Sequence, residues 1–231
     1  MLAALLVLSS LTAGGGDALE AYSTVLKQNV SKGRVNYPGV AAMRDDLDRY
    51  INYVATSRVP GGKNRASAFY IDAYNALVLA SVLDSGQPKS VLDVKDFFKR
   101  KVHTVAGKKV SLDQLEKEIL NPLAKDPRTH MVLVCAAIGC PILDSRPYTG
   151  SNLERRIEHA TVRYIRSPSG ARVSGGALAM SKIFEWYAAD FGGADAAVEF
   201  VRKRLKPEKN ETLGQSPKVS TFEYNWRLNK R

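Results

Sequence analysis

Apolar residues recur every three or four positions over much of the chain, which places them on one face of an α-helix. This pattern predicts a helix over 17–30 and another from Pro38 to Ser57. The stretch 66–83 is apolar almost all round, so we expect a central buried helix there, with Asn64 as its cap.

Serines mark the starts of later helices. Ser111 and Ser151 each stand three residues before a Gln or Glu, the spacing of a capping box, and predict helices to about residues 120 and 165. Ser181 is expected to cap an aromatic helix to residue 190 whose rings pack in the core, and another helix follows up to residue 205.

Other segments are predicted to be extended. The run 129–135 is continuously apolar and rich in β-branched residues, which is typical of a buried strand. Glycine-containing turns predict two hairpins, and a last strand is expected near the C-terminus: 101–105 with 108–110, 172–174 with 177–180, and 219–224. We therefore predict one α/β or α+β domain over 17–231, helix-rich and built around a small sheet that contains 129–135.

The first residues have the features of an export signal. Leu2 to Leu11 form an apolar run of signal-peptide length, and small residues follow to Gly16. Residues 1–16 are therefore predicted to be a signal peptide, and the protein is expected in the periplasm or outside the cell. No Lys or Arg precedes the run, which fits a start codon placed too late or, alternatively, a buried N-terminal helix. We expect no later stretch to be long and apolar enough to span a bilayer.

Composition and charge narrow the class of protein. Of 231 residues 45% are apolar and 25% charged, a composition that indicates neither a disordered chain nor a coiled coil. The net charge of +11 predicts attraction to anionic envelope components. Nucleic acid is not an expected partner, because the basic residues are scattered and no binding motif accompanies them.

The two cysteines, Cys135 and Cys140, stand at the start of a loop that runs to Tyr148. In an oxidising compartment such a pair predicts a disulfide that shapes the loop. The alternative is a thiol nucleophile with His130 as its base, although residues 130 and 135 would point to opposite faces of a strand. No metal or cofactor is predicted, since the Cys and His residues lack ligand spacing and no phosphate-binding glycine loop is present.

Asp72 and Asn75 lie three residues apart, so they share one stripe of the predicted buried helix. Buried polar side chains must be hydrogen-bonded, which favours a structural network to a neighbouring loop or to Arg65. In the other interpretation, these residues and Tyr148 line a cleft that holds a ligand.

The chain also contains an ordered set of longer motifs: GRVNY near 35, FYIDAYNAL at 69–77, GKKVSLDQLE at 107–116, DPRTHMVLVCAAIGCPIL at 126–143, SKIFEWYAADFGG at 181–193 and YNWRLN at 224–229. In order and spacing this set resembles the bacterial members of the "domain of unknown function" family numbered 547, from about residue 20 to the end. The resemblance implies export but no agreed activity.

The resemblance also extends to single positions. Asn75, His130, Cys135, Cys140 and Pro141 match the family pattern. The chain departs from it elsewhere, with Asp72 where the family usually has Asn, Ala136-Ala137 where it has Gly-Ser, and Lys117 where it often has His. Any catalytic role of that Gly-Ser pair or histidine is in doubt here.

Two functions follow as hypotheses. The first is an exported envelope domain that binds a ligand, with a Cys135–Cys140 disulfide shaping its site. The second is a thiol-dependent hydrolase or transferase that uses Cys135 or Cys140 with His130. The sequence leaves open whether the protein is an enzyme, and its oligomeric state.

Overall fold

The computed structural model describes the backbone of residues 5–231 and the side chains from residue 15 onward. The predicted signal peptide therefore lies partly outside the described residues and stays a prediction. From Leu5 the backbone belongs to helix α1 (Leu5–Asn29), which includes the helix predicted over 17–30.

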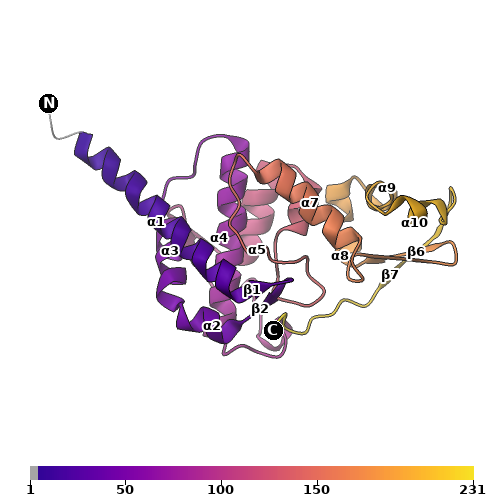
Figure 1. Ribbon diagram of the computed structural model, residues 1–231, viewed down its shortest axis with the longest axis horizontal. Coiled ribbons are helices and arrows are strands. Elements are labelled where there is room, and N and C mark those ends of the chain that lie inside the picture. The colour runs from indigo at the N-terminus through magenta and orange to yellow at the C-terminus, as the bar shows by residue number, and fades with distance from the viewer. Residues whose placement is uncertain (1–4) are drawn as a thin grey trace.

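The N-terminal half is a bundle of helices around one buried helix (Figure 1). This central helix is α4 (Lys63–Asp84), and residues 66–82 of it are all buried, as the apolar pattern predicts. The helix begins at Lys63 and Gly62 occupies the N-cap position, so the prediction of Asn64 as the cap is wrong. The segment predicted as one helix from Pro38 is broken at Met43 into α2 (Tyr37–Ala42) and α3 (Arg44–Thr56).

Helix α4 is also long and apolar enough to cross a membrane by length and composition, which we did not expect of any later stretch. In the structure 94% of its apolar stretch is buried inside the molecule. This is the environment of a core helix, whose apolar residues contact protein all round.

Short helical pieces follow in the middle of the chain. Ser111 caps its helix as predicted: its hydroxyl accepts from the Gln114 amide, and the Gln114 side chain accepts from the Ser111 amide. Ser151 makes no such cap, because Asn152 occupies the N-cap position. The pieces are α5 (Leu112–Gln114), a π-helical turn (Leu115–Leu120), α6 (Asn121–Ala124), a 3₁₀ helix (Pro127–Met131) and α7 (Leu153–Ile165).

The strand predicted over 129–135 does not form. Its first residues belong to the 3₁₀ helix, which Asp126 caps, and the rest has no regular structure although it is buried. The Asn75 side chain replaces a neighbouring strand: its amide donates to the Val132 carbonyl and its oxygen accepts from the Val134 amide, both at 2.9 Å. The buried backbone is therefore satisfied without a sheet.

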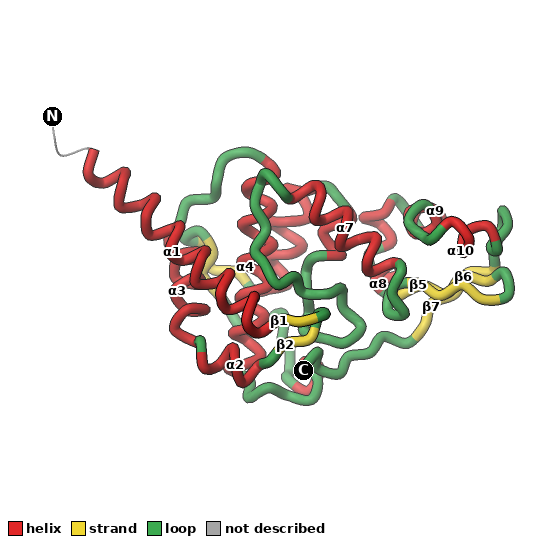
Figure 2. Tube along the Cα trace, viewed as in Figure 1, coloured by secondary structure: helices red, strands yellow, loops and turns green. Residues whose placement is uncertain are grey.

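The three-stranded sheet is formed instead by later residues of the chain, between 171 and 222, and lies at the end of the molecule away from α1 (Figure 2). Its order is β5-β6-β7, with β5 and β6 antiparallel and β6 and β7 parallel. Both predicted hairpins and the last strand are confirmed: β3 (His103–Val105) with β4 (Lys108–Val110), β5 (Ala171–Ser174) with β6 (Ala177–Ser181), and β7 (Lys218–Phe222). The fold is α+β.

The aromatic helix predicted from Ser181 is interrupted at Tyr187. The remaining elements are β1 (Val30–Ser31), β2 (Arg34–Val35), a 3₁₀ turn (Val91–Asp93), α8 (Ile183–Trp186), a 3₁₀ helix (Ala188–Phe191), α9 (Ala194–Arg202) and α10 (Pro207–Glu211). Beyond β7 the chain returns to the helical bundle and ends beside β1 and β2 (Figure 1). There the Leu228 amide donates to the Lys89 carbonyl, and the Tyr37 hydroxyl donates to the Asn229 side chain.

Candidate functional site

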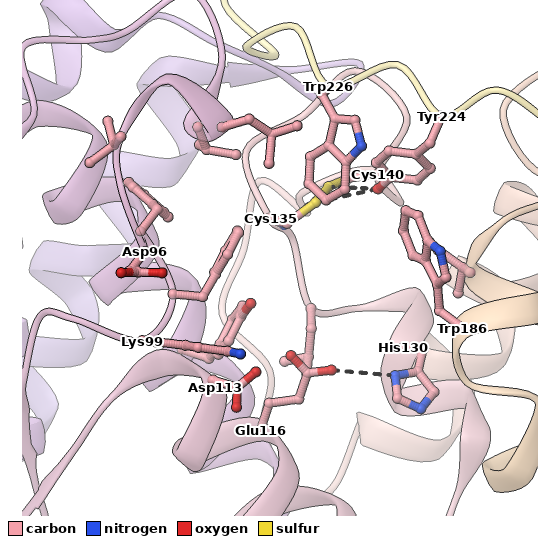
Figure 3. A pocket seen from close by; sticks show the side chains of 18 of the residues that line it. Asp96, Lys99, Asp113, Glu116, His130, Cys135, Cys140, Trp186, Tyr224 and Trp226 are labelled. Atoms are coloured by element: carbon pink, nitrogen blue, oxygen red, sulfur yellow. Dashed lines mark hydrogen bonds and ion pairs between the residues drawn. A yellow bond between two sulfur atoms is a disulfide. The ribbon is translucent and has the colours of Figure 1, made fainter.

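The returning C-terminal tail closes one side of a cavity of about 400 Å³ (Figure 3). Its other walls come from the segment 91–99, the π-helical turn, the 3₁₀ helix that carries His130 with the irregular segment after it, and α8. The side chains on which the argument depends are Phe98, Glu116, His130, Cys135, Cys140, Trp186, Tyr187, Tyr224 and Trp226.

Three aromatic rings pack together on one wall. The ring centroids of Trp186 and Trp226 are 5.6 Å apart, and Tyr224 lies 4.7 Å from Trp226 and 5.0 Å from Trp186. Trp186 is 45% exposed, so the prediction that the aromatic residues of its helix pack in the core is wrong for this residue. Both tryptophans of the chain therefore line the same cavity.

A disulfide joins Cys135 and Cys140 in the cavity wall, as predicted. The Tyr224 hydroxyl donates to the Cys140 sulfur at 3.2 Å, and the Cys135 amide donates to the same sulfur at 3.1 Å. Burial raises the pKa of Tyr224, which keeps this hydroxyl protonated as a donor. Ala136 adopts the left-handed conformation with φ 61° at the turn between the cysteines.

His130 and Glu116 contribute acid and base side chains to the cavity, and Asp190 lies beside His130 outside the cavity lining. His130 Nε2 lies 2.8 Å from the Asp190 carboxylate, and its Nδ1 lies 3.7 Å from the Glu116 carboxylate. The Tyr187 ring stacks on the His130 ring at 3.8 Å. Burial is the main cause that raises the pKa of Tyr187, and the neighbouring Glu116 carboxylate raises this pKa further. The buried imidazole is thereby fixed between two carboxylates.

His130 and the two cysteines line the same cavity, which a strand would have prevented for His130 and Cys135. The 3₁₀ helix and the irregular segment after it remove the alternation on which that expectation rested. While the disulfide is closed, however, neither sulfur is a thiolate.

The other four predicted residues lie elsewhere. The Asp72 carboxylate accepts from the Tyr148 amide at 2.8 Å, and Asn75 bonds the backbone as described. Burial raises the pKa of Asp72, which that hydrogen bond and the charge of Arg156 oppose. Arg65 does not join this network but donates to the Gly61 carbonyl. None of the four lines the cavity beside the disulfide, and Asn75 borders a void of only about 10 Å³.

Sequence reasoning missed Glu116 and the aromatic residues of the tail. One signal was present for Glu116: it lies on the apolar side of the helix that the capping box opens, where a carboxylate is unusual. Among the side chains that the structure describes, no group of three or more His, Cys, Asp or Glu residues is placed to hold a metal ion.

Comparison with known families supports the resemblance over part of the chain. Residues 61–165 match the family described as "Protein of unknown function, DUF547". The matched segment holds Glu116, His130 and both cysteines, whereas Trp186, Tyr224 and Trp226 lie beyond it. No curated protein and no solved structure matches the chain significantly.

Proposed function

We propose that this protein is an exported envelope domain that binds a small molecule in the cavity beside the Cys135–Cys140 disulfide. The observation that carries the proposal is the cavity itself. Its volume of about 400 Å³ lies in the range of small-molecule sites, and aromatic walls with a few polar groups are the usual lining of such sites.

The disulfide supports both parts of the proposal. Disulfides persist in oxidising compartments, which favours export. The bond also closes a very short loop, with five residues of sequence separation, directly in the cavity wall. A short covalent loop holds the wall in one shape, and a site that is already in its bound shape loses less entropy on binding.

Tryptophan fluorescence offers a direct test, because both tryptophans line the cavity. We expect compounds from a panel of small aromatic molecules to change the emission in a saturable way, and the Trp226→Leu variant to bind them at least tenfold more weakly. Phe222→Leu serves as the control, since Phe222 stacks on Arg172 outside the cavity. If no compound in the panel gives a saturable change, the binding proposal fails.

The thiol-dependent hydrolase or transferase remains the alternative, and the closed disulfide weighs against it. Alkylation of natively purified protein, followed by intact-mass measurement with and without reduction, distinguishes the two. We expect both cysteines to be modified only after reduction. Rapid modification of one cysteine without reduction would favour the alternative.

Export and attachment to an anionic envelope component are tested together by cell fractionation. A net charge of +11 favours association with anionic surfaces, and such association weakens as salt screens the charges. We expect the protein in the envelope fraction and its release by washing with concentrated salt. Recovery in the cytosolic fraction would contradict export.

A further inference from the structure

We propose that the ligand of this cavity is an organic cation, a protonated amine on a flat apolar body, whose charge is bound by Glu116. This inference rests on the proposed function and adds the chemical class of the ligand.

The first argument is the burial of Glu116. Its side chain is only 10% exposed and borders the cavity. Removing a carboxylate from water costs free energy, and a cation that binds beside it offsets this cost. Over the residues whose side chains are described, no Lys or Arg forms an ion pair with Glu116. Its polar neighbours are His130, at 3.7 Å, the Tyr187 hydroxyl, and the more distant charge of the exposed Lys117.

His130 makes its hydrogen bond to Asp190 and none to Glu116. A carboxylate only accepts hydrogen bonds, so the 2.8 Å contact with Asp190 requires the proton on Nε2. The Nδ1 that faces Glu116 lies 3.7 Å from the carboxylate, which is longer than a hydrogen bond. Glu116 therefore keeps the capacity to accept from a cationic donor in the cavity.

The second argument is the charge of the lining. Asp96, Asp113 and Glu116 border the cavity together with Lys95 and Lys99, in a chain whose net charge is +11. Asp113 forms an ion pair with Lys117 at 2.6 Å, so its charge is balanced there. Asp96 and the two lysines are exposed, whereas Glu116 is buried. Water screens the lysines more than it screens Glu116, so the inner part of the cavity favours positive charge.

The third argument is the aromatic wall. The faces of tryptophan and tyrosine rings carry negative electrostatic potential, which attracts cations and repels anions. Trp186, Tyr224 and Trp226 present such rings to the cavity, and Phe98 also lines it. Flat apolar groups stack well on the same surfaces. A cationic head on a flat body thus matches both parts of the lining.

A matched set of three probes tests this inference: 2-phenylethylamine, 2-phenylethanol and phenylacetate. They share one aromatic body and carry a positive, a neutral and a negative head. Titration is followed by tryptophan fluorescence at neutral pH. We expect the amine to bind at least tenfold more tightly than the alcohol, as one charge-assisted hydrogen bond provides, and phenylacetate to bind most weakly.

Glu116→Gln then identifies the partner of the charge. In this variant the affinity for 2-phenylethylamine should fall to within about threefold of the affinity for 2-phenylethanol, and the affinity for 2-phenylethanol should not change. The control is Glu118→Gln, which removes an exposed carboxylate from the same π-helical turn and should keep the full preference.

The outcomes separate the two proposals. Equal binding of all three probes, or a preference for phenylacetate, overturns the cationic ligand and leaves the binding function standing. A preference for the amine that survives in Glu116→Gln overturns the role of Glu116. Failure of every probe and of the wider aromatic panel overturns the binding function, and this inference with it. The comparison of probes on the unaltered protein holds even if a variant does not fold.

Discussion

Two polar side chains of the central helix hydrogen-bond the backbone of the loop around the disulfide, although neither lines the cavity. Asn75 replaces the hydrogen bonds of a missing strand, and Asp72 holds the amide of Tyr148. The segment that Asn75 bonds leads directly into Cys135, so the position of the disulfide depends on a side chain that lies sixty residues earlier. Asn75 and Asp72 of α4 therefore fix the backbone conformation of the segments on either side of the disulfide loop.

Substitution of Asn75 by Ala should be strongly destabilising. It leaves the Val132 carbonyl and the Val134 amide without partners in a buried segment, and each orphaned group costs about 1–3 kcal/mol. We expect the free energy of unfolding in urea to fall by about 2–5 kcal/mol. Asn52→Ala, at an exposed position on α3, should change it by less than about 0.5 kcal/mol. A loss below about 1 kcal/mol for Asn75→Ala would show that water replaces the amide.

Asp72→Asn should make stability less dependent on pH. Burial raises the pKa of Asp72 in the folded protein, so the contribution of this group to stability is complete below the unfolded pKa and is lost as pH rises toward the folded pKa. Asparagine keeps an oxygen to accept from the Tyr148 amide and does not ionise.

Urea unfolding at pH 4 and pH 8 measures this effect. The stability of Asp72→Asn relative to the parent protein should rise with pH, by up to about 1.4 kcal/mol for each unit over which the folded carboxyl stays protonated. The same difference between the two proteins at both pH values would mean that Asp72 gains its charge without cost in the folded state.

At the scale of elements, the sequence predicts what depends on local spacing. The buried helix 66–83, the capping box at Ser111 and the two hairpins are confirmed because neighbouring residues determine them. The strand predicted over 129–135 is wrong. A run of apolar, β-branched residues gives the same sequence pattern whether its backbone hydrogen-bonds a neighbouring strand or the side chain of Asn75. Hydrogen bonding across 57 residues leaves no periodic signal.

The two serines with capping-box spacing provide a matched pair. Ser111 bonds the Gln114 amide and is buried, whereas Ser151 is exposed and caps nothing. Ser111→Ala should lower the free energy of unfolding by about 1 kcal/mol, and Ser151→Ala by less than about 0.5 kcal/mol. Ser111 also precedes the turn that carries Glu116, so its loss should weaken binding of 2-phenylethylamine. Equal effects of the two substitutions on unfolding would contradict the assigned cap.

Over the whole molecule, the cavity is assembled from parts that are distant in sequence. His130 and the two cysteines could be proposed as site residues from the sequence, because they lie close together in one segment and their side chains are reactive. Trp226 and Tyr224 were not, because their place depends on the return of the chain from β7 to the bundle, where the Asn229 amide donates to the Ala136 carbonyl. That bond fixes the tail to the turn between the two cysteines, so the disulfide and the aromatic wall form one unit.

Reduction of the disulfide should therefore affect the cavity more than the fold. A loop this short gives about 2 kcal/mol of stabilisation on the chain-entropy account, which a large core tolerates. The same step frees the turn at Ala136, and with it the support of Tyr224 and Trp226. Protein reduced with dithiothreitol should keep its far-ultraviolet circular dichroism while binding 2-phenylethylamine several-fold more weakly. Unchanged affinity after confirmed reduction would mean that the tail holds the aromatic wall without the disulfide, and unfolding on reduction would mean that the bond stabilises the entire core.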